Sequence, residues 1–123
     1  MITVYGIPNC DTVKKARLWL AANGLAHVFH DFRKDGVPAS RLGAWTSAAG
    51  LDLLLNRKGT TWRKLDASAQ ALAATAGGAM ELMTETPSVI KRPVVEWNGE
   101  AGPLTVGFDP DIWARLAKEH GKI

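Results

Sequence analysis

The chain has 123 residues, of which 46% are hydrophobic and 22% charged, a composition that predicts one compact domain with its own core. It contains no apolar run near the roughly 20 residues that a membrane-spanning helix needs, and no basic segment with a signal-peptide core at its start, so we expect a cytoplasmic protein without membrane contact. The net charge of +3 is spread over short Lys and Arg clusters with acids between them, which argues against a nucleic-acid-binding surface.

The only cysteine, Cys10, lies where an apolar run ends and a helical pattern begins. Residues 1–5 predict a short buried strand, Gly6 and Pro8 interrupt it, and a helix follows. Because the first N–H groups of a helix lack intrahelical partners and the helix dipole is positive there, a thiolate is favoured at this position. A single cysteine also excludes an internal disulfide and a cysteine-based zinc site. The residues expected on the buried face of the helix are Val13, Ala16, Leu20 and Ala21.

The helix alone has a limited effect on the thiol of Cys10. A charge at a helix terminus is stabilised by ~0.3–1 kcal/mol and at best by ~2 kcal/mol, whereas moving a pKa by one unit takes ~1.4 kcal/mol. Asp11, the next residue, opposes ionisation of the thiol. We therefore expect a nearby cation from another part of the chain if the pKa is to fall further.

The segment after this helix completes a β-α-β unit. Asn23 and Gly24 form a helix-stop signal, and residues 26–32 alternate in the manner of a strand. His27 and His30 fall in that strand without carboxylate or cysteine partners at coordinating spacing, so we expect no metal site.

A long helical region follows a turn that ends at Pro38. Apolar periodicity over residues 39–79 predicts helices, which Gly50 divides. Residues 68–76 read as an alanine-rich helix that ends at the glycine pair 77–78, and residues 80–84 as a further short helix. Cations gather at Arg57, Lys58 and Arg63, in the turn that precedes the 68–76 helix, where they are either a solvated loop or anion-binding groups that face Cys10.

The last third of the chain predicts a hairpin and a final helix. Pro93 opens a β-branched run at the first position of a strand, a place where sheets tolerate proline. Strands at 94–97 and 103–106 flank a turn at 98–100. Asp109 is the expected cap of the last helix. Its expected inner face consists of Ile112, Trp113, Leu116 and Ala117.

This order of elements is that of an α/β, thioredoxin-like mixed sheet with an inserted helical subdomain. Residues 5–10 (YGIPNC), 56–65 (NRKGTTWRKL) and 90–94 (IKRPV) closely resemble the ArsC/Spx/YffB family of arsenate-reductase-like proteins, and its YffB branch most closely. The resemblance implies a single ArsC/Spx-like domain over residues 1–123. Its thioredoxin-like core would comprise about 1–36 and 86–123, and its helical insertion about 37–85.

The same resemblance implies roles for individual residues. Cys10 is the nucleophile, Pro93 the cis-proline that faces it, and Arg92 the anion-binding arginine that supplies the cation sought above. Lys14 adds positive potential or is simply an exposed helix residue. The plainest rival interpretation makes Cys10 a buried structural thiol. The residues expected to bind substrate or glutathione are Asn9, Thr12, Lys14, Arg57, Lys58 and Pro93.

The function that follows is a thiol-dependent oxidoreductase, specifically a glutathione-dependent thiol reductase acting on disulfides or small oxyanions. Glutathione or another low-molecular-weight thiol is the expected co-substrate, glutaredoxin a candidate partner, and no tightly bound cofactor is expected. One alternative is a glutathione/glutaredoxin-coupled arsenate reductase, although Asn56 and residues 107–108 replace arginines of the arsenate-reducing members. The other is a non-enzymatic, Spx-like regulator that binds RNA polymerase. Val13 stands at the second position of a Cys-x-x-Cys pair, so a two-cysteine switch is excluded.

Overall fold

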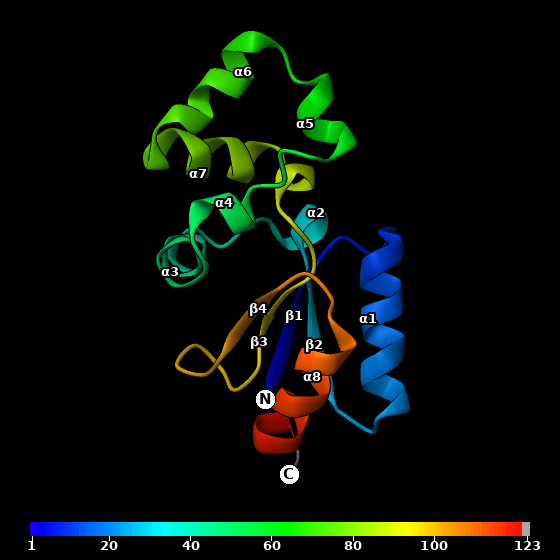
Figure 1. The fold of residues 1–123 in the computed structure, drawn as a ribbon. Coiled ribbons are helices and arrows are strands. Elements are labelled where there is room, and N and C mark those ends of the chain that lie inside the picture. Colours follow the sequence, from blue (N-terminus) through cyan, green and yellow to red (C-terminus); the bar gives the residue numbers. More distant parts are fainter. Residues whose placement is uncertain (122–123) are drawn as a thin grey trace. The chain divides into compact units, whose positions relative to one another are not determined.

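The computed structural model describes residues 1–121, in which the chain forms two compact units (Figure 1). The first contains residues 1–32 and the chain from residue 92 onward, and the second contains residues 33–91. The second unit extends beyond the expected insertion at 37–85 on both sides. At its C-terminal end, the N–H of Lys91 donates to the carbonyl of Leu54 (2.8 Å), which ties this segment to the helices. That both units form one domain over residues 1–123 stays a prediction, and residues 122–123 lie outside the described range.

The first unit is built on a mixed four-stranded sheet. Its strands are β1 (Ile2–Gly6), β2 (His27–Asp31), β3 (Val94–Glu96) and β4 (Leu104–Val106), in the order β2-β1-β3-β4. Strand β2 pairs with β1 in parallel, whereas the β1–β3 and β3–β4 pairs are antiparallel. This arrangement confirms the predicted thioredoxin-like sheet with its β-α-β opening and C-terminal hairpin.

Two helices pack on one face of this sheet. They are α1 (Asp11–Ala22) and α8 (Pro110–Leu116), and the π-helical turn η3 (Ala117–Gly121) follows α8. Trp113 of α8 lies at the centre of the core, with its ring 5.1 Å from that of Trp97 and 4.7 Å from that of Phe108. The core residues of this unit are Ile2, Val4, Ala16, Leu20, Leu25, Val95, Trp97, Trp113 and Ala117.

Two residues expected in this core are exposed instead. Ala21 is exposed, and Ile112 keeps 40% of its surface accessible to solvent. Each directly neighbours a fully buried residue, Leu20 or Trp113, and successive helical residues point about 100° apart. Both predictions were wrong because the buried stripe of each helix is narrower than the apolar pattern suggested.

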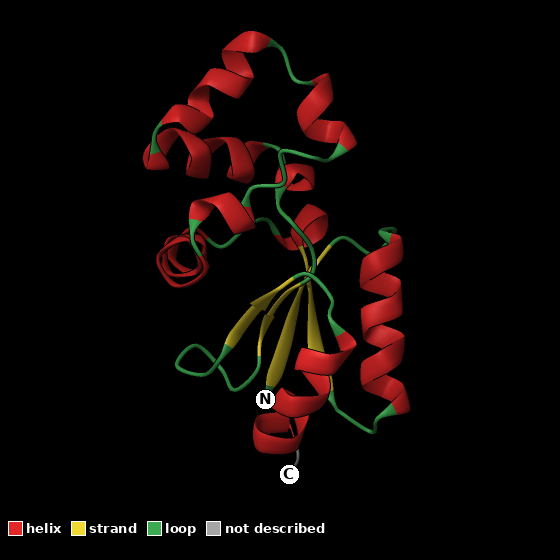
Figure 2. Cartoon of the chain, in the orientation of Figure 1, coloured by secondary structure: helices red, strands yellow, loops and turns green. Residues whose placement is uncertain are grey.

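The second unit consists of short helices (Figure 2). The predicted helix over 68–76 is confirmed as far as residue 74, by α6 (Ala67–Ala71) and η1 (Leu72–Ala74). Its predicted end is wrong, because the chain leaves helical geometry at Thr75 (φ −122°, ψ 155°). The Thr75 hydroxyl accepts a hydrogen bond from Gly78 N–H (3.1 Å), so residues 77–78 begin a helix rather than end one. A Cβ at Gly78 would collide with the carbonyl of Leu72. The helices are α2 (Phe32–Asp35), α3 (Ala39–Ala49), α4 (Leu51–Leu54), α5 (Thr60–Lys64), α6 (Ala67–Ala71), η1 (Leu72–Ala74), α7 (Ala76–Glu85) and η2 (Pro87–Val89).

The helices and side-chain clusters of residues 1–121 offer neither a membrane span nor a metal site. The 12-residue α1 falls short of the roughly 20 residues that cross a bilayer, and none of the helices within this range is long and apolar enough to do so. Over the same described residues, no three His, Cys, Asp or Glu side chains gather closely enough to hold a metal ion.

Candidate active site at Cys10

Cys10 occupies the N-cap position of α1, as the sequence predicted. Its backbone is extended (φ −84°, ψ 125°), and its carbonyl accepts the first helical hydrogen bond from Lys14 N–H (2.9 Å). Its own N–H donates to the carbonyl of Ile7 (3.2 Å), which closes a tight turn after β1. The thiol is partly exposed, and is not buried deep in apolar packing. The turn and the helix together fix the sulfur at a position that solvent can reach.

A close approach between β1 and α1 sets the position of this turn. Val13, in the first turn of α1, is fully buried. A Cβ placed on Gly6 would lie only 2.9 Å from Cγ2 of Val13. The end of β1 therefore needs a glycine so that the start of α1 can pack against it.

Sheet pairing brings Arg92 to the same place. Tyr5 of β1 lies opposite Val94 of antiparallel β3, so the end of β1 is next to the beginning of β3. The Arg92–Pro93 peptide bond is cis, as the resemblance implied. The carbonyl of Pro93 accepts a hydrogen bond from Gly107 N–H (2.9 Å), which anchors this segment to the hairpin. Arg92 consequently reaches Cys10 from a distant part of the sequence and forms a hydrogen bond with its side chain.

The surroundings of Cys10 lower the pKa of its thiol. Partial burial is the largest single influence and raises the pKa, because it disfavours the charged form. Backbone N–H groups of Val13 and Thr12 and the guanidinium of Arg92 act in the opposite direction, and together they outweigh burial. Cys10 makes no ordinary side-chain capping hydrogen bond to α1, so these amides act mainly on the thiolate. The cysteine thus ionises more readily than an ordinary thiol, which favours nucleophilic attack.

The other residues predicted around Cys10 occupy different positions within this unit. Asn9 is exposed in the turn, and Thr12 contributes its backbone N–H to the sulfur. Pro93 is buried. Lys14 is exposed on α1 and lines a pocket beside that helix. The structure thus brings Arg92 and the amides of Thr12 and Val13 to the sulfur, while contacts of Asn9, Thr12 and Pro93 with a substrate stay predictions.

Arg57 and Lys58 belong to the second unit. Nη1 of Arg57 forms an ion pair with Oδ1 of exposed Asp52 (3.1 Å). The N–H of Lys58 donates to Oδ1 of Asn56 (3.2 Å), and its carbonyl accepts from Nη2 of Arg63 (3.0 Å). These contacts describe a hydrogen-bonded cationic loop, and anion binding by Arg57 or Lys58 stays a prediction.

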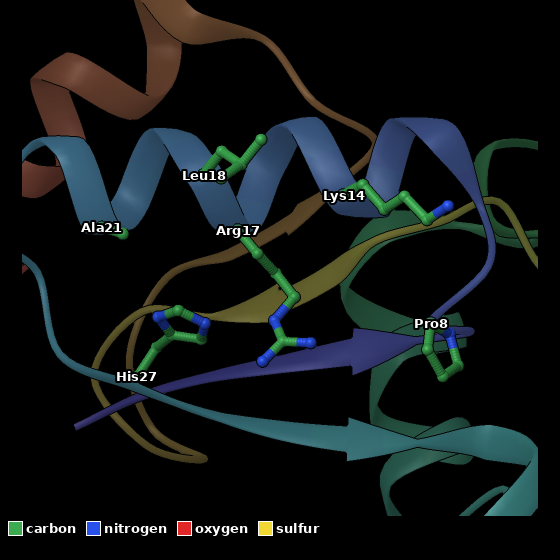
Figure 3. Close-up of a pocket in the computed structure, with 6 residues that line it drawn as sticks. All are labelled: Pro8, Lys14, Arg17, Leu18, Ala21 and His27. Atoms are coloured by element: carbon green, nitrogen blue, oxygen red, sulfur yellow. The ribbon is translucent and has the colours of Figure 1, made fainter.

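Sequence reasoning did not identify one feature, a pocket of about 440 Å³ between α1 and β2. Arg17 reaches from α1 toward the strands in this pocket (Figure 3). The i, i+3 spacing of Lys14 and Arg17 could have shown that they share a helix face. It could not have shown that β2 closes the other side. The lining residues are Pro8, Lys14, Arg17, Leu18, Ala21 and His27.

Comparison with known proteins identifies relatives that match most of the chain. Residues 5–116 match the model of the ArsC family. An uncharacterized protein of Haemophilus influenzae is 44% identical over 110 residues, which are 89% of this chain and 92% of that protein. The global transcriptional regulator Spx of Streptococcus pyogenes is 24% identical over 125 residues, with 99% of this chain and 90% of that protein covered.

Solved structures of similar proteins have the same fold. A protein called YFFB superposes with a TM-score of 0.86 and 43% identity, covering 94% of this chain and 98% of that one. An arsenate reductase (ArsC) related protein from Brucella melitensis superposes with a TM-score of 0.70 and 44% identity, covering 93% of this chain and 92% of that one. The similarity thus extends over nearly the whole chain.

Proposed function

The chain belongs to the ArsC family, and from this premise we propose that it is a glutathione-dependent thiol reductase whose nucleophile is Cys10. The observation that supports this proposal is the lowered pKa of a partly exposed thiol that lies between helix amides and Arg92. A structural cysteine needs neither solvent access nor a guanidinium beside its sulfur. The fold is arsenate-reductase-like.

The reaction proceeds by two thiol–disulfide exchanges. The Cys10 thiolate attacks one sulfur of a disulfide R–S–S–R′, forms the mixed disulfide Cys10–S–S–R and releases R′–S⁻. Because this chain has no second cysteine, the thiolate of glutathione attacks the R-linked sulfur, restores the Cys10 thiolate and carries R away as glutathionyl disulfide. The thiolate of a second glutathione then attacks the glutathionyl sulfur of that product, releases R–S⁻ and forms oxidised glutathione. The two electrons come from glutathione throughout.

The surrounding residues would hold the reactants in this cycle. Arg92 stabilises the attacking thiolate and afterwards binds an anionic group of the substrate, with Arg57 or Lys58 as further candidates for a glutathione carboxylate. Asn9, Thr12, Lys14 and Pro93 would contact the bound substrate. Glutathione is abundant in the reducing cytoplasm, which is the compartment we propose, and glutaredoxin is a candidate partner for the release step.

Mass spectrometry and coupled turnover test this function directly. We expect oxidised glutathione to add one glutathionyl group to the wild-type protein, because only Cys10 can form a mixed disulfide, and none to Cys10→Ser. With bis(2-hydroxyethyl) disulfide, glutathione, glutathione reductase and NADPH, the wild type should turn over, whereas Cys10→Ser should match the enzyme-free rate. Lys15→Gln, an exposed change on α1, serves as the control and should keep wild-type turnover. A wild-type protein that forms the adduct but shows no turnover above background would contradict a reductase function.

Arsenate reduction is a second candidate, favoured by the similarity to the Brucella melitensis protein described as arsenate reductase related. It would use the same thiolate on an oxyanion. Asn56 and residues 107–108 occupy the positions of further arginines expected in arsenate-reducing members, so the anion would have fewer cationic ligands here. Release of arsenite from arsenate in the presence of glutathione and glutaredoxin distinguishes this activity from disulfide reduction.

A regulatory role is the third candidate, favoured by the full-length similarity to the transcriptional regulator Spx. In this role the chain would bind RNA polymerase, with no requirement for the cysteine. Recovery of RNA polymerase by both the wild type and Cys10→Ser, without disulfide turnover, would favour this function over catalysis.

A further inference from the structure

The α1–β2 pocket has the dimensions of a small-molecule site. Its volume of about 440 Å³ lies within the range of about 300–1,000 Å³ typical of ligand pockets. Lining residues Lys14 to Ala21 span roughly 10 Å of helix at 1.5 Å per residue, which is about the length of three extended residues. Lys14 lies one helical turn, ~6 Å along the axis, beyond Cys10. A ligand of tripeptide size that extends along this pocket would therefore have one end at Lys14, one helical turn from Cys10.

The charge of the pocket is positive. Lys14 and Arg17 contribute two cations, and the described lining residues include no acid. Neither cation forms an ion pair with another side chain of residues 1–121. Arg17 instead lies over the ring of Phe29, with Cζ 4.2 Å from the ring centroid. This contact holds the guanidinium in place without neutralising its charge.

Two buried nitrogen atoms at this pocket lack hydrogen-bond partners among the described residues. They are Nε of Arg17 and Nε2 of His27. The other ring nitrogen of His27, Nδ1, faces the carbonyl of Leu25 at 3.5 Å, so only one side of the imidazole is matched. Buried polar atoms in native proteins almost always have partners. The described residues therefore leave these two buried nitrogen atoms without hydrogen-bond partners.

Apolar surface accompanies these charges. Leu18, 70% exposed, lines the pocket on the helix side. Pro8 lines it at the end toward Lys14 (Figure 3). A ligand that matches this surface combines one or more carboxylates with an apolar or peptide-like body.

We propose that this pocket binds a small organic anion of about tripeptide size, with its carboxylate on Arg17 and Lys14 and its body against Pro8 and Leu18. Resting on the reductase function proposed above, the bound molecule is the non-reacting part of an acidic disulfide substrate whose sulfur reaches Cys10. Arg17 is then a residue that determines specificity for anionic over neutral disulfides.

A binding experiment tests the pocket without any chemistry at the thiol. Oxidised glutathione is titrated calorimetrically into Cys10→Ser, into Cys10→Ser/Arg17→Gln and into Cys10→Ser/Lys15→Gln. Lys15 is an exposed neighbour on α1 outside the pocket lining, so its variant removes the same charge from a different face. We expect the Arg17 variant to bind at least tenfold more weakly and the Lys15 variant to bind within twofold of Cys10→Ser. Equal affinity in all three proteins, or equal losses in both variants, overturns the proposal.

A kinetic experiment tests the link to specificity. In the Cys10 protein, Arg17→Gln should lower kcat/KM for 3,3′-dithiodipropionate, an acidic disulfide, about tenfold, mainly through KM, and change kcat/KM for neutral bis(2-hydroxyethyl) disulfide less than twofold. Arg17→Lys should retain part of the preference. Equal losses with both disulfides would mean that Arg17 only supports the structure, and would overturn the specificity role. If the wild type reduces neither disulfide, the reductase function fails, whereas the titrations with Cys10→Ser still decide whether the pocket binds the anion.

Discussion

The packing of Gly6 against Val13 predicts that a single methyl group added to β1 will disturb the reactive cysteine. In Gly6→Ala the new Cβ would lie 2.9 Å from Cγ2 and 3.5 Å from Cγ1 of Val13. Carbon atoms pack best at about 3.5–4.0 Å, so the shorter contact must lengthen by roughly 0.5–1 Å. Val13 lies in the first turn of α1, the helix whose N-cap is Cys10, and its N–H is one of the groups that stabilise the thiolate. Movement of this residue therefore affects both stability and reactivity.

The expected magnitude follows from opposing effects on the free energy of unfolding. Overpacking a core typically costs ~1–3 kcal/mol, while replacing glycine within a strand recovers ~0.5–1 kcal/mol. Gly6→Ala should therefore destabilise by roughly 0.5–2 kcal/mol. Val13→Ala removes buried methyl groups from a side chain with no solvent exposure, at a cost of roughly 2–3 kcal/mol. In the double variant the alanine at 6 occupies part of that space, so its loss should be about 1–2 kcal/mol smaller than the sum.

Urea unfolding of the wild type, Gly6→Ala, Val13→Ala and the double variant measures the interaction energy between positions 6 and 13. The rate of iodoacetamide alkylation at pH 7 measures the effect on Cys10. Alkylation should slow in Gly6→Ala and recover part of its rate in the double variant. Gly43→Ala is the control, because apart from its chain neighbours and the adjacent backbone of α3, no heavy atom lies within 4 Å of the position that its new methyl group would occupy. It should stabilise by up to ~1 kcal/mol and leave alkylation unchanged. Strictly additive losses, or a stabilised Gly6→Ala, would refute this account of the turn.

Three further outcomes follow from contacts at the site and in α8. Arg92→Ala should raise the pKa of Cys10, because the guanidinium favours the thiolate, and so move the midpoint of the alkylation–pH curve to higher pH. The control Lys15→Ala should leave this midpoint unchanged. Equal midpoints in the wild type and both variants would count against a role for Arg92. Because folding lowers the pKa of Cys10, stability relative to Cys10→Ser should rise with pH from the folded to the unfolded pKa, stay constant above it, and be lost as pH falls through the folded value. If the free energies of unfolding of the wild type and Cys10→Ser, measured with urea, differed by the same amount at every pH, that result would contradict the linkage. Asp109→Ala should lower the free energy of unfolding in urea by ~1 kcal/mol, because the Asp109 carboxylate accepts hydrogen bonds from the N–H groups of Asp111 (3.0 Å) and Ile112 (3.4 Å). An unchanged unfolding midpoint would show that the cap does not stabilise the protein.

Local signals in the sequence account for the parts of the fold that were predicted correctly. The stop at Asn23 and Gly24 and the cap at Asp109 each satisfy backbone groups within a few residues, so they can be read without the tertiary structure. The position of Cys10 at the start of α1 is a local feature of the same kind. The pairing of Cys10 with Arg92 is not a local feature, because no spacing rule connects a helix cap to a segment so distant in the chain. It was predicted from the family resemblance.

The errors arose where a pattern of residue types was ambiguous or where tertiary contacts decide. An alanine-rich run with a glycine pair fits a helix that ends at the glycines, but the Thr75 side chain caps a new helix there, and Gly78 makes room for the carbonyl of Leu72. The exposure of Ala21 could not be predicted from its apolar character, since alanine is compatible with both the buried and the exposed face of a helix. The pocket at Arg17 depends on a strand packed beside α1, which periodicity along a single helix does not reveal.

The chemistry of Cys10 depends on residues that touch neither its sulfur nor the guanidinium of Arg92. The two groups meet because Tyr5 lies opposite Val94, and that register is held by the buried hydrogen bond from the Tyr5 hydroxyl to Oε1 of Glu96 (2.8 Å) and by Trp97 in the aromatic core. A shift of one residue between β1 and β3 would turn every β3 side chain to the opposite face, placing the Glu96 carboxylate among the core aromatics. Glu96 is also buried in the observed register, but there its carboxylate accepts the Tyr5 hydrogen bond. In the shifted register it would be buried without that partner, and this cost disfavours the shift. The same core that stabilises the sheet thereby determines the distance between thiolate and cation, so core variants that loosen β3 should lower the reactivity of Cys10 before the protein unfolds.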